Sequence, residues 1–269
     1  MLATCPSGRV RWMRCGPEGA ADARRGGSMA LNVIDVKTIF GSWPKRAIDV
    51  SPDDLLASMR RHGISRAVSL ASAAILYDDQ PGNDETWKAC ASRPELVPAA
   101  TLHPYNYLAD EGRVPALKEQ GFRFFRFFNK LLGYSLDLYC VTQILRQLGQ
   151  VGMPCMMDAT SPEDIWRMGR LSQANDVDII CTELGYIVEA EVIAVARDYP
   201  RLYFDAGHMT SPDGIELFVR HVGAHRLVYG SDYPFDDTLP SLLMLQHAAI
   251  SEADRQRIAR ANIEELLGL

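Results

Sequence analysis

The stretch MPCMMDATSPEDIWRMGRLSQANDVDIICTE, residues 153–183, contains the pattern that decides the fold. It begins with the apolar run 153–159 and ends with the apolar run 177–183, and both have the length and composition of buried strands. Between them, Ser161 followed by Pro162 marks the start of a helix, with serine as N-cap and proline at the first helical position. A strand, a helix and a second strand in this order are typical of an α/β fold.

The same alternation extends in both directions from this stretch. Six further strand-like runs lie at residues 33–40, 67–72, 96–103, 122–128, 202–207 and 226–232. Helix starts are predicted at Ser51-Pro52 and Ser211-Pro212, helix ends at Gly63 and Gly152, and a terminal helix over residues 251–269.

Eight strands that alternate with helices predict a single-domain α/β fold, a (β/α)8 TIM barrel over residues 31–269. A doubly wound open sheet is the second choice, and it would carry a glycine-rich phosphate loop after its first strand. Gly41-Ser42-Trp43-Pro44 stands there instead, without a G-x-G-x-x-G motif. Residues 1–30 have no hydrophobic period and are expected to be a disordered extension, with Met29 as a candidate start of the protein.

Composition narrows the classes of partner. The chain has 269 residues, of which 47% are hydrophobic, and a formal net charge of −6. An acidic chain has no general attraction for nucleic acid or for anionic membranes, and no apolar run is long enough to span a bilayer. Six cysteines without a C-x-x-C pair indicate buried free thiols, Cys155 and Cys181 among them, and so a reducing cytoplasm. We expect a small-molecule substrate, no nucleic acid and no membrane.

Four segments carry a resemblance to a known family. VIDVKTIFG at residues 33–41 resembles an I-D-x-H-x-H-x-G motif, and RLVYGSDYP at residues 226–234 resembles a G-S-D-x-P motif. LVPAATLHP at residues 96–104 and NIEELLGL at residues 262–269 add to it. The chain thus resembles the second amidohydrolase family, which includes amino-carboxymuconate-semialdehyde decarboxylase and related lactonases. The resemblance implies a TIM barrel, a homodimer, and either hydrolysis of a C–O or C–N bond or loss of a carboxylate.

The departures from the family pattern concern its metal ligands. The family binds a divalent metal with two histidines on strand one, a histidine on strand five and an aspartate on strand eight, and a histidine on strand six assists. Here Lys37 and Ile39 stand at the first two positions, Asp158 at the third and Glu183 at the strand-six position, while Asp232 is retained. Isoleucine cannot bind a metal and a charged lysine repels one, so we expect no metal and no other cofactor.

The replacing residues suggest chemistry of their own. If the register follows the family, Lys37, Asp158, Glu183 and Asp232 converge at the C-terminal mouth of the barrel. We expect Lys37 to supply the charge that the metal would provide, to stabilise an oxyanion or to attack a carbonyl, while Asp232 or Glu183 moves protons. The alternative is a buried ion network that only stabilises the barrel end.

Five residues are candidate substrate contacts. Arg126 lies inside the apolar run FFRFF at residues 124–128, and its partner is either a substrate carboxylate or an internal acid. Trp43 follows the first strand, where it could cover a substrate or anchor a loop. The other candidates stand at or after strand ends: His103, His208 and Tyr233.

Three hypotheses remain open at this point. The first is a metal-independent amidohydrolase-like enzyme, more a hydrolase than a lyase, that acts on a small carboxylated molecule. The second is a non-catalytic binding or scaffold barrel with Lys37 tied up by carboxylates and the mouth filled by side chains. The third is a metal-dependent hydrolase with a rebuilt ligand set, drawn from His103, His208, Asp158, Glu183 and Asp232.

Overall fold

A computed structural model describes residues 31–184 and 189–269. The expected disordered extension over residues 1–30, with Met29, lies outside the described residues. Leu31 to Leu269 form one compact unit.

Nine strands form one sheet in the order β2-β1-β3-β4-β5-β6-β7-β8-β9. All neighbouring pairs from β1 to β9 are parallel, and only β2 pairs with β1 in the antiparallel sense. The strands are β1 (Val33–Trp43), β2 (Ile48–Val50), β3 (Ile64–Ala71), β4 (Leu96–Ala100), β5 (Phe124–Arg126), β6 (Cys155–Asp158), β7 (Ile179–Thr182), β8 (Leu202–Asp205) and β9 (Leu227–Val228).

The sheet curls until its first and last parallel strands meet. Thr38 in β1 forms a parallel bridge with Tyr233, which lies just beyond β9. The Val36 N–H donates to the Tyr229 carbonyl at 2.9 Å, and the Ile39 N–H donates to the Tyr233 carbonyl at 3.0 Å. The eight parallel strands therefore have the arrangement of the predicted (β/α)8 barrel, and the open doubly wound sheet was wrong.

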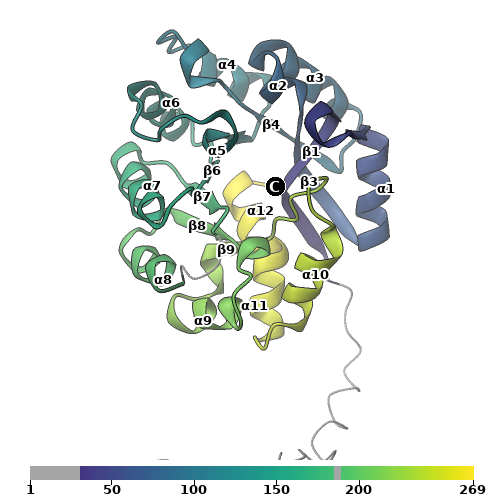
Figure 1. The fold of residues 1–269 in the computed structure, drawn as a ribbon, viewed down its shortest axis with the longest axis vertical. Coiled ribbons are helices and arrows are strands. Elements are labelled where there is room, and N and C mark those ends of the chain that lie inside the picture. The colour runs from purple at the N-terminus through teal and green to yellow at the C-terminus, as the bar shows by residue number, and fades with distance from the viewer. Residues whose placement is uncertain (1–30, 185–188) are drawn as a thin grey trace, which may run out of the picture. The chain divides into compact units, whose positions relative to one another are not determined.

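The helices surround the strands, as the ribbon shows (Figure 1). They are α1 (Pro52–His62), α2 (Ala73–Leu76), α3 (Asp79–Ala91), α4 (Arg113–Gln120), α5 (Asn129–Leu132), α6 (Tyr139–Gln150), α7 (Pro162–Asn175), α8 (Glu189–Asp198), α9 (Gly214–His221), α10 (Thr238–His247), α11 (Glu252–Gln256) and α12 (Asn262–Leu267). Short 3-10 turns lie at η1 (Pro44–Arg46), η2 (Pro104–Asn106), η3 (Ala206–His208) and η4 (Ala224–Arg226), and a π-helical turn, η5 (Arg257–Ala261), joins α11 to α12.

Two apolar clusters make up the core because alternate strand residues face opposite sides of the sheet. The larger cluster lies between the strands and the helices and includes Phe125, Cys155 and Ile179. The smaller cluster fills the barrel interior and is made of residues such as Ile34, Phe124, Met156, Ile180 and Val228. Its members also include two residues of α12, Ile263 and Leu267, so the last helix closes one end of the barrel.

Most of the predicted helix signals are present. Ser51 caps α1 with a full capping box, and Gly63 ends that helix in the left-handed conformation at φ +71°. The predicted start at Ser211 was wrong, because the Gly214 N–H donates to the Ser211 carbonyl and forms a turn. Asp213, at φ 58°, completes that turn, and α9 begins only at Gly214.

The short strand β2 was not predicted from the sequence. The other two helix predictions hold closely, since α7 begins at Pro162 and α6 ends at Gln150, two residues before Gly152.

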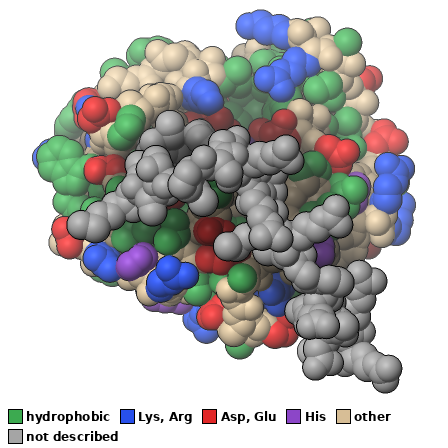
Figure 2. Space-filling view, turned by 60° about the horizontal axis from the view of Figure 1, so that its bottom comes forward, with side chains coloured by type: hydrophobic (Ala, Val, Ile, Leu, Met, Phe, Trp, Pro, Cys, Tyr) green, Lys and Arg blue, Asp and Glu red, His purple; other side chains and the backbone are tan. Residues whose placement is uncertain are grey.

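Among the described residues, no helix has both the length and the apolar character needed to cross a membrane. The described cysteines are free thiols: Cys90, Cys140, Cys155 and Cys181. On the face that Figure 2 presents, Lys and Arg side chains are interspersed with Asp and Glu side chains. This mixture fits a chain with a small net charge.

Candidate active site

The strand ends opposite α12 carry ionisable side chains. Arg126 follows Phe124 by two residues, Asp158 follows Met156, and both are buried. Because residues two apart share a face of the sheet, the interior face changes from apolar to charged along each strand. The charged groups therefore meet at the C-terminal mouth, where TIM barrels place their active sites.

An irregularity in β1 helps to place Lys37. The pairing of β1 with β3 shifts register between Asp35 and Thr38, and such bulges redirect side chains. The fully buried Asp35 accepts hydrogen bonds from the Lys37 and Ser231 backbone N–H groups, both at 3.0 Å. Burial raises the pKa of Asp35 to about 7, against the opposing effect of these bonds. Asp35 thus ties β1 to the chain after β9 directly below the site.

Lys37 lies at the centre of the charged cluster. Its side chain is 0% exposed, and its Nζ lies 2.6 Å from Glu183 Oε1 and 3.2 Å from Asp232 Oδ1. The His208 ring nitrogens lie 3.4 and 3.5 Å from the same Nζ. The ammonium is therefore enclosed by two carboxylates and an imidazole, and those groups separate it from solvent.

Glu183 is held between two lysines. Its Oε2 accepts a hydrogen bond from Lys130 Nζ at 2.5 Å, in addition to the contact with Lys37. Burial acts to raise the pKa of Glu183, but the Lys37 charge and the two lysine hydrogen bonds outweigh it and bring the pKa down to about 2. Glu183 is ionised throughout the physiological range.

Glu183 and Asp232 share an uncommon backbone conformation. Both have φ near +61°, in the left-handed region that non-glycine residues rarely adopt. Each such residue costs about 1–3 kcal/mol and is often found at functional sites. The backbone is therefore strained at the two residues that carry these carboxylates.

His208 is oriented by Asp205. The His208 Nδ1 lies 2.9 Å from Asp205 Oδ2, and that oxygen also accepts from Thr182 Oγ1 at 2.9 Å. Burial alone would lower the pKa of His208, but the hydrogen bond and charge of Asp205 reverse this effect and raise it. Asp205 was not predicted as a site residue from the sequence, although it lies within the predicted strand run 202–207.

Asp158 and Arg126 lie beside this cluster. Burial raises the pKa of the Asp158 carboxyl, although the charges of Arg126 and Lys37 oppose the change. The Arg126 Nη2 lies 3.8 Å from Asp232 Oδ1, and its guanidinium stacks 4.6 Å from the centre of the Phe128 ring. Within the described chain, its buried Nε and Nη1 have no hydrogen-bond partner. Arg126 therefore has donor capacity to spare.

These groups border a cavity of about 380 Å³, which we call the mouth cavity. A volume of this order accommodates a small organic molecule. Acids, cations and apolar side chains all contribute to it. The lining residues are Ile39, Trp43, Arg46, Arg126, Phe128, Lys130, Leu131, Asp158, Glu183, Asp232 and Phe235.

A second cavity, of about 330 Å³, borders His208. His208 and Ser231 line it, together with Asp236 and Asp237. Glu183 and Asp232 line the mouth cavity and His208 lines this one, so the groups in contact with Lys37 border both cavities.

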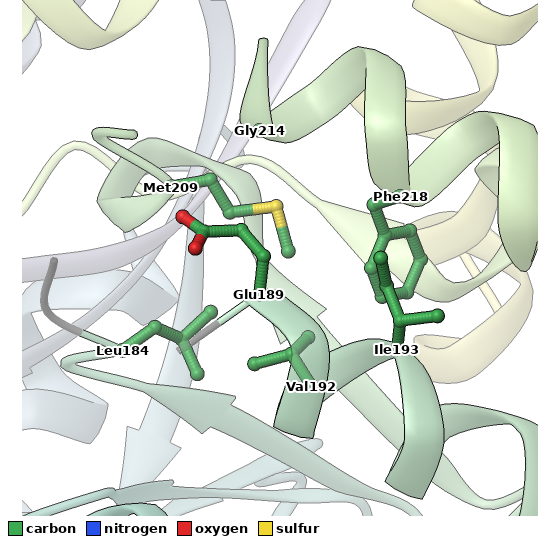
Figure 3. Close-up of a pocket in the computed structure, with 7 residues that line it drawn as sticks. All are labelled: Leu184, Glu189, Val192, Ile193, Met209, Gly214 and Phe218. Carbon is green, nitrogen blue, oxygen red and sulfur yellow. The ribbon is translucent and has the colours of Figure 1, made fainter. Parts of the chain in front are cut away.

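One further pocket is too small to hold a ligand (Figure 3). It has about 10 Å³, which is room for at most one water molecule. Its lining is mainly apolar and comes from α8, from α9 and from the segments that follow β7 and η3: Leu184, Glu189, Val192, Ile193, Met209, Gly214 and Phe218.

The structure brings most of the candidate residues together, but not all. Trp43 is the last residue of β1 rather than a loop residue, and it packs edge-on against Phe235 at 4.7 Å in the wall of the mouth cavity. His103 instead caps η2, where its ring accepts the Tyr105 N–H at 3.3 Å. Tyr233 contributes its backbone to barrel closure and lines neither cavity.

The residues that were not foreseen follow strands closely. Arg46, Lys130 and Phe235 lie six, two and three positions beyond the predicted strand runs 33–40, 122–128 and 226–232, in segments without a periodic signal. Their approach to the cavity depends on loop conformation, which the strand pattern does not specify.

The site can be tested for the divalent metal that the fold suggests. Glu183, His208 and Asp232 offer ligand atoms that all lie within 4.8 Å of one another. However, Lys37 Nζ lies in contact with all three, so a divalent ion could enter only if this ammonium left. The residues present do not fit a metal while Lys37 keeps its place and charge.

A parallel barrel with ionisable residues at the C-terminal ends of its strands defines the class of TIM-barrel enzymes. Within that class, the family model described as Amidohydrolase matches residues 39–269. The chain therefore belongs to the amidohydrolase family. No curated protein matches it.

Solved structures share the fold at low sequence identity. The 5-carboxyvanillate decarboxylase from Novosphingobium aromaticivorans, with bound manganese, has a TM-score of 0.72 and 15% identity, over 91% of this chain and 98% of that one. The probable 2-pyrone-4,6-dicarboxylic acid hydrolase from Acinetobacter baumannii, with bound citric acid, has a TM-score of 0.69 and 14% identity, over 88% and 100%. The 5-carboxyvanillate decarboxylase from Sphingomonas paucimobilis has a TM-score of 0.65 and 12% identity, over 89% and 99%.

Proposed function

We propose that the protein is a metal-independent amidohydrolase-like enzyme that hydrolyses or decarboxylates a small carboxylated molecule in the mouth cavity. One observation carries the proposal. A buried lysine ammonium, rather than a metal, balances Glu183 and Asp232 on the floor of an open cavity with aromatic walls. A preorganised charge of this kind can support reaction chemistry without a metal.

Lys37 acts as a positioning residue in this proposal. Its side chain is 0% exposed behind Glu183 and Asp232, so a substrate in the mouth cavity meets the carboxylates first. This geometry argues against attack by Lys37 on a carbonyl and favours its role as a fixed charge.

Asp158 and Asp232 are the groups that we assign to proton transfer. The raised pKa of Asp158 favours its neutral form, which can donate a proton, and Asp158 lines the cavity. Asp232 also lines the cavity, and within the described chain its contacts with Lys37 and Arg126 both fall on Oδ1. Asp232 Oδ2 is therefore the oxygen that we assign as proton acceptor. Acid and base roles in one site commonly go to groups in contrasting environments.

Hydrolysis uses both carboxyl groups. Asp232 takes one proton from the attacking water while the water oxygen bonds to the substrate carbon. As the bond from that carbon to the leaving oxygen or nitrogen breaks, Asp158 gives its proton to the leaving atom. Decarboxylation uses Asp158 alone, which protonates the substrate carbon as the C–C bond breaks and CO₂ departs. Because Asp232 lines the cavity as well as Asp158, a base and an acid are both in place, and this favours hydrolysis.

Cationic and aromatic groups suit a carboxylated, flat substrate. Arg126 offers spare N–H donors, and charge-assisted bonds to a carboxylate would satisfy them. The internal partner Asp232 is 3.8 Å away and meets this need only in part. Trp43, Phe128 and Phe235 supply apolar walls for the body of the substrate.

The structure agrees with only one of the two predictions of the non-catalytic alternative. It predicts a tied-up Lys37, which the ion pairs support, and a filled mouth, which a cavity of about 380 Å³ contradicts. The enzyme is therefore the better interpretation.

The test uses protein purified in chelator and a panel of aromatic carboxylates and lactones. We expect turnover without added metal, with acid release if the reaction is hydrolysis and CO₂ release if it is decarboxylation. Asp158→Asn should lower kcat about 10²–10⁴-fold, because it cannot donate the carboxyl proton. Wild-type activity should fall as rising pH ionises Asp158.

A matched control is Asp49→Asn, because Asp49 is exposed on β2 away from the cavity lining. It should leave kcat unchanged. Turnover that requires a divalent metal, or equal rates for both variants, would contradict the proposal.

A cytoplasmic homodimer is part of the same proposal. The four cysteines in the described residues are free thiols, three of them buried, and support a reducing compartment, while the homodimer rests on family membership. Light scattering of the purified chain would test the dimer.

A further inference from the structure

The cation at the centre of the site is part of the polypeptide. Lys37 Nζ lies 2.6 Å from Glu183, 3.2 Å from Asp232 and 3.4 Å from the nearer His208 nitrogen. The side chain is 0% exposed, so these groups replace the water that an ammonium would otherwise keep. The protein has thus built a position that holds a positive charge.

The groups around this position also form a chemically suitable set of metal ligands. Their ligand atoms lie within 4.8 Å of one another, and His208 Nε2 lies 3.8 Å from Glu183 Oε1. Open zinc sites have three protein ligands, and imidazole and carboxylate groups both bind zinc, at ligand distances of about 2.0–2.2 Å. The three side chains would need to move only slightly inward around such an ion.

Asp205 already holds the histidine in the orientation that a metal requires. Histidine ligands commonly donate their second ring N–H to a carboxylate, which fixes the ring and its tautomer. Here His208 Nδ1 lies 2.9 Å from the fully buried Asp205 Oδ2. Asp205 is fixed in turn by Thr182 and by the Gly207 N–H, each at 2.9 Å. His208 Nε2 is therefore the nitrogen free to bind an ion.

We propose that Lys37 closes a latent divalent-cation site made by Glu183, His208 and Asp232, and that shortening Lys37 opens this site to Zn²⁺. One side chain then separates a metal-free site from a metal-binding one. The inference goes beyond the proposed function because it concerns metal binding and not turnover. Its ligands come from the ends of β7, β8 and β9, and only Asp232 coincides with the ligand set that the family resemblance implies.

An ion has two routes to this position. Glu183 and Asp232 border the mouth cavity, and His208 borders the second cavity. Loss of the Lys37 side-chain end would join the site to both, so the ligands need not unfold to receive zinc.

The test compares wild type with Lys37→Ala after both are stripped with chelator and dialysed against Zn²⁺. Elemental analysis and titration calorimetry should find about one tightly bound zinc per chain in the variant and none in wild type. Ligand binding to the folded state stabilises it, so zinc should also raise the Tm of Lys37→Ala and leave that of wild type unchanged.

Three controls separate this site from surface binding of zinc. Lys130→Ala removes the other lysine on Glu183 but leaves Lys37 in place, so it should bind no zinc. Adding Asp232→Asn to Lys37→Ala should abolish binding. Adding Asp205→Asn instead should weaken it about 10–100-fold, as for other partners of metal-binding histidines.

Each result decides the matter. Stoichiometric zinc in wild type would overturn this proposal and the metal independence of the proposed function together. A folded Lys37→Ala that binds no zinc would overturn the latent site alone. If Lys37→Ala is unfolded without metal, zinc should restore its circular dichroism, and Lys37→Ser provides a second variant. Failure of both variants to fold or bind at saturating zinc also overturns it.

Discussion

The two ends of the barrel interior differ in their side chains, which are apolar at one end and charged at the other. At one end, Phe124, Met156 and Ile180 pack against Ile263 and Leu267 of α12. At the other end, the same strands present charged groups only two residues further along, at Arg126 and Asp158. The side chains named at both ends are buried, but only at the mouth do ionic contacts take the place of apolar packing.

The apolar end of the barrel mainly provides stability, and the charged end provides the functional groups. The apolar end gains free energy from burial, which needs no exact geometry. The charged end needs every ion to be matched, and Glu183 and Asp232 add backbone strain at φ +61°. Such costs persist in proteins mainly where a site uses them, so the charged end is the functional one.

The largest effect should follow from removing the central charge. Lys37→Met keeps much of the side-chain length but leaves Glu183 and Asp232 without their buried cation. Breaking a buried ion pair from one side typically costs about 3–5 kcal/mol, and we expect a loss of unfolding free energy in this range. Urea denaturation at pH 7 measures it. A loss below about 1 kcal/mol would mean that the cluster behaves like surface ion pairs.

A comparable loss at the other end should leave the site intact. Ile263 is 0% exposed, and Ile263→Ala should cost about 2–5 kcal/mol by leaving a cavity under the barrel. Ligand binding in the mouth cavity should be unchanged by this substitution. Leu266→Ala, on the same helix but less buried, is the control and should cost less. Loss of ligand affinity in Ile263→Ala would show that the two ends are coupled.

The fold was largely predictable because strand and helix signals are local. All eight parallel strands fall within or next to the predicted runs, and the acids at their ends follow from strand alternation. The antiparallel β2 was missed because its three residues carry too short a pattern. The predicted helix start at Ser211 was wrong because a turn with a left-handed Asp213 precedes α9, and propensity alone does not specify that conformation.

The site was predictable in its members more than in its arrangement. Lys37, Glu183 and Asp232 do meet, but the fully buried position of the ammonium depends on a β1 irregularity that no residue pattern announces. His103 was a candidate by the same reasoning as His208, yet it bonds its own turn. The difference lies in loop geometry, which follows from tertiary packing.

An effect of comparable size should appear as a pH dependence of stability. Burial raises the pKa of Asp35 to about 7, so the folded state binds this proton more tightly than the unfolded state. Its contribution is fully present below about pH 4 and is lost as pH rises to 7, at roughly 1.4 kcal/mol per unit. Asp35→Asn should therefore gain stability relative to wild type across this interval, as urea unfolding at several pH values would measure.

Glu183 also makes stability depend on pH, but in a different interval from Asp35. Its pKa is lowered to about 2, so its contribution is present above about pH 4.5 and is lost as pH falls toward 2. The two acids thus act in different pH intervals and with opposite sign. A difference between Asp35→Asn and wild type that is constant from pH 4 to 7 would contradict the assignment to Asp35.

The smallest effect should come from the other lysine on the same carboxylate. The Glu183 carboxylate lies 2.5 Å from Lys130 Nζ and 2.6 Å from Lys37 Nζ, so the two distances are almost equal. The exposure of the two lysines differs, because the side chain of Lys130 is 53% exposed and that of Lys37 is 0% exposed. Exposed ion pairs contribute about 0–1 kcal/mol and are screened by salt, so Lys130→Met should cost no more than this. Urea unfolding in low salt and in high salt should show the difference from wild type shrinking as salt is added. Equal costs for Lys130→Met and Lys37→Met would mean that distance, and not burial, sets the strength of these contacts.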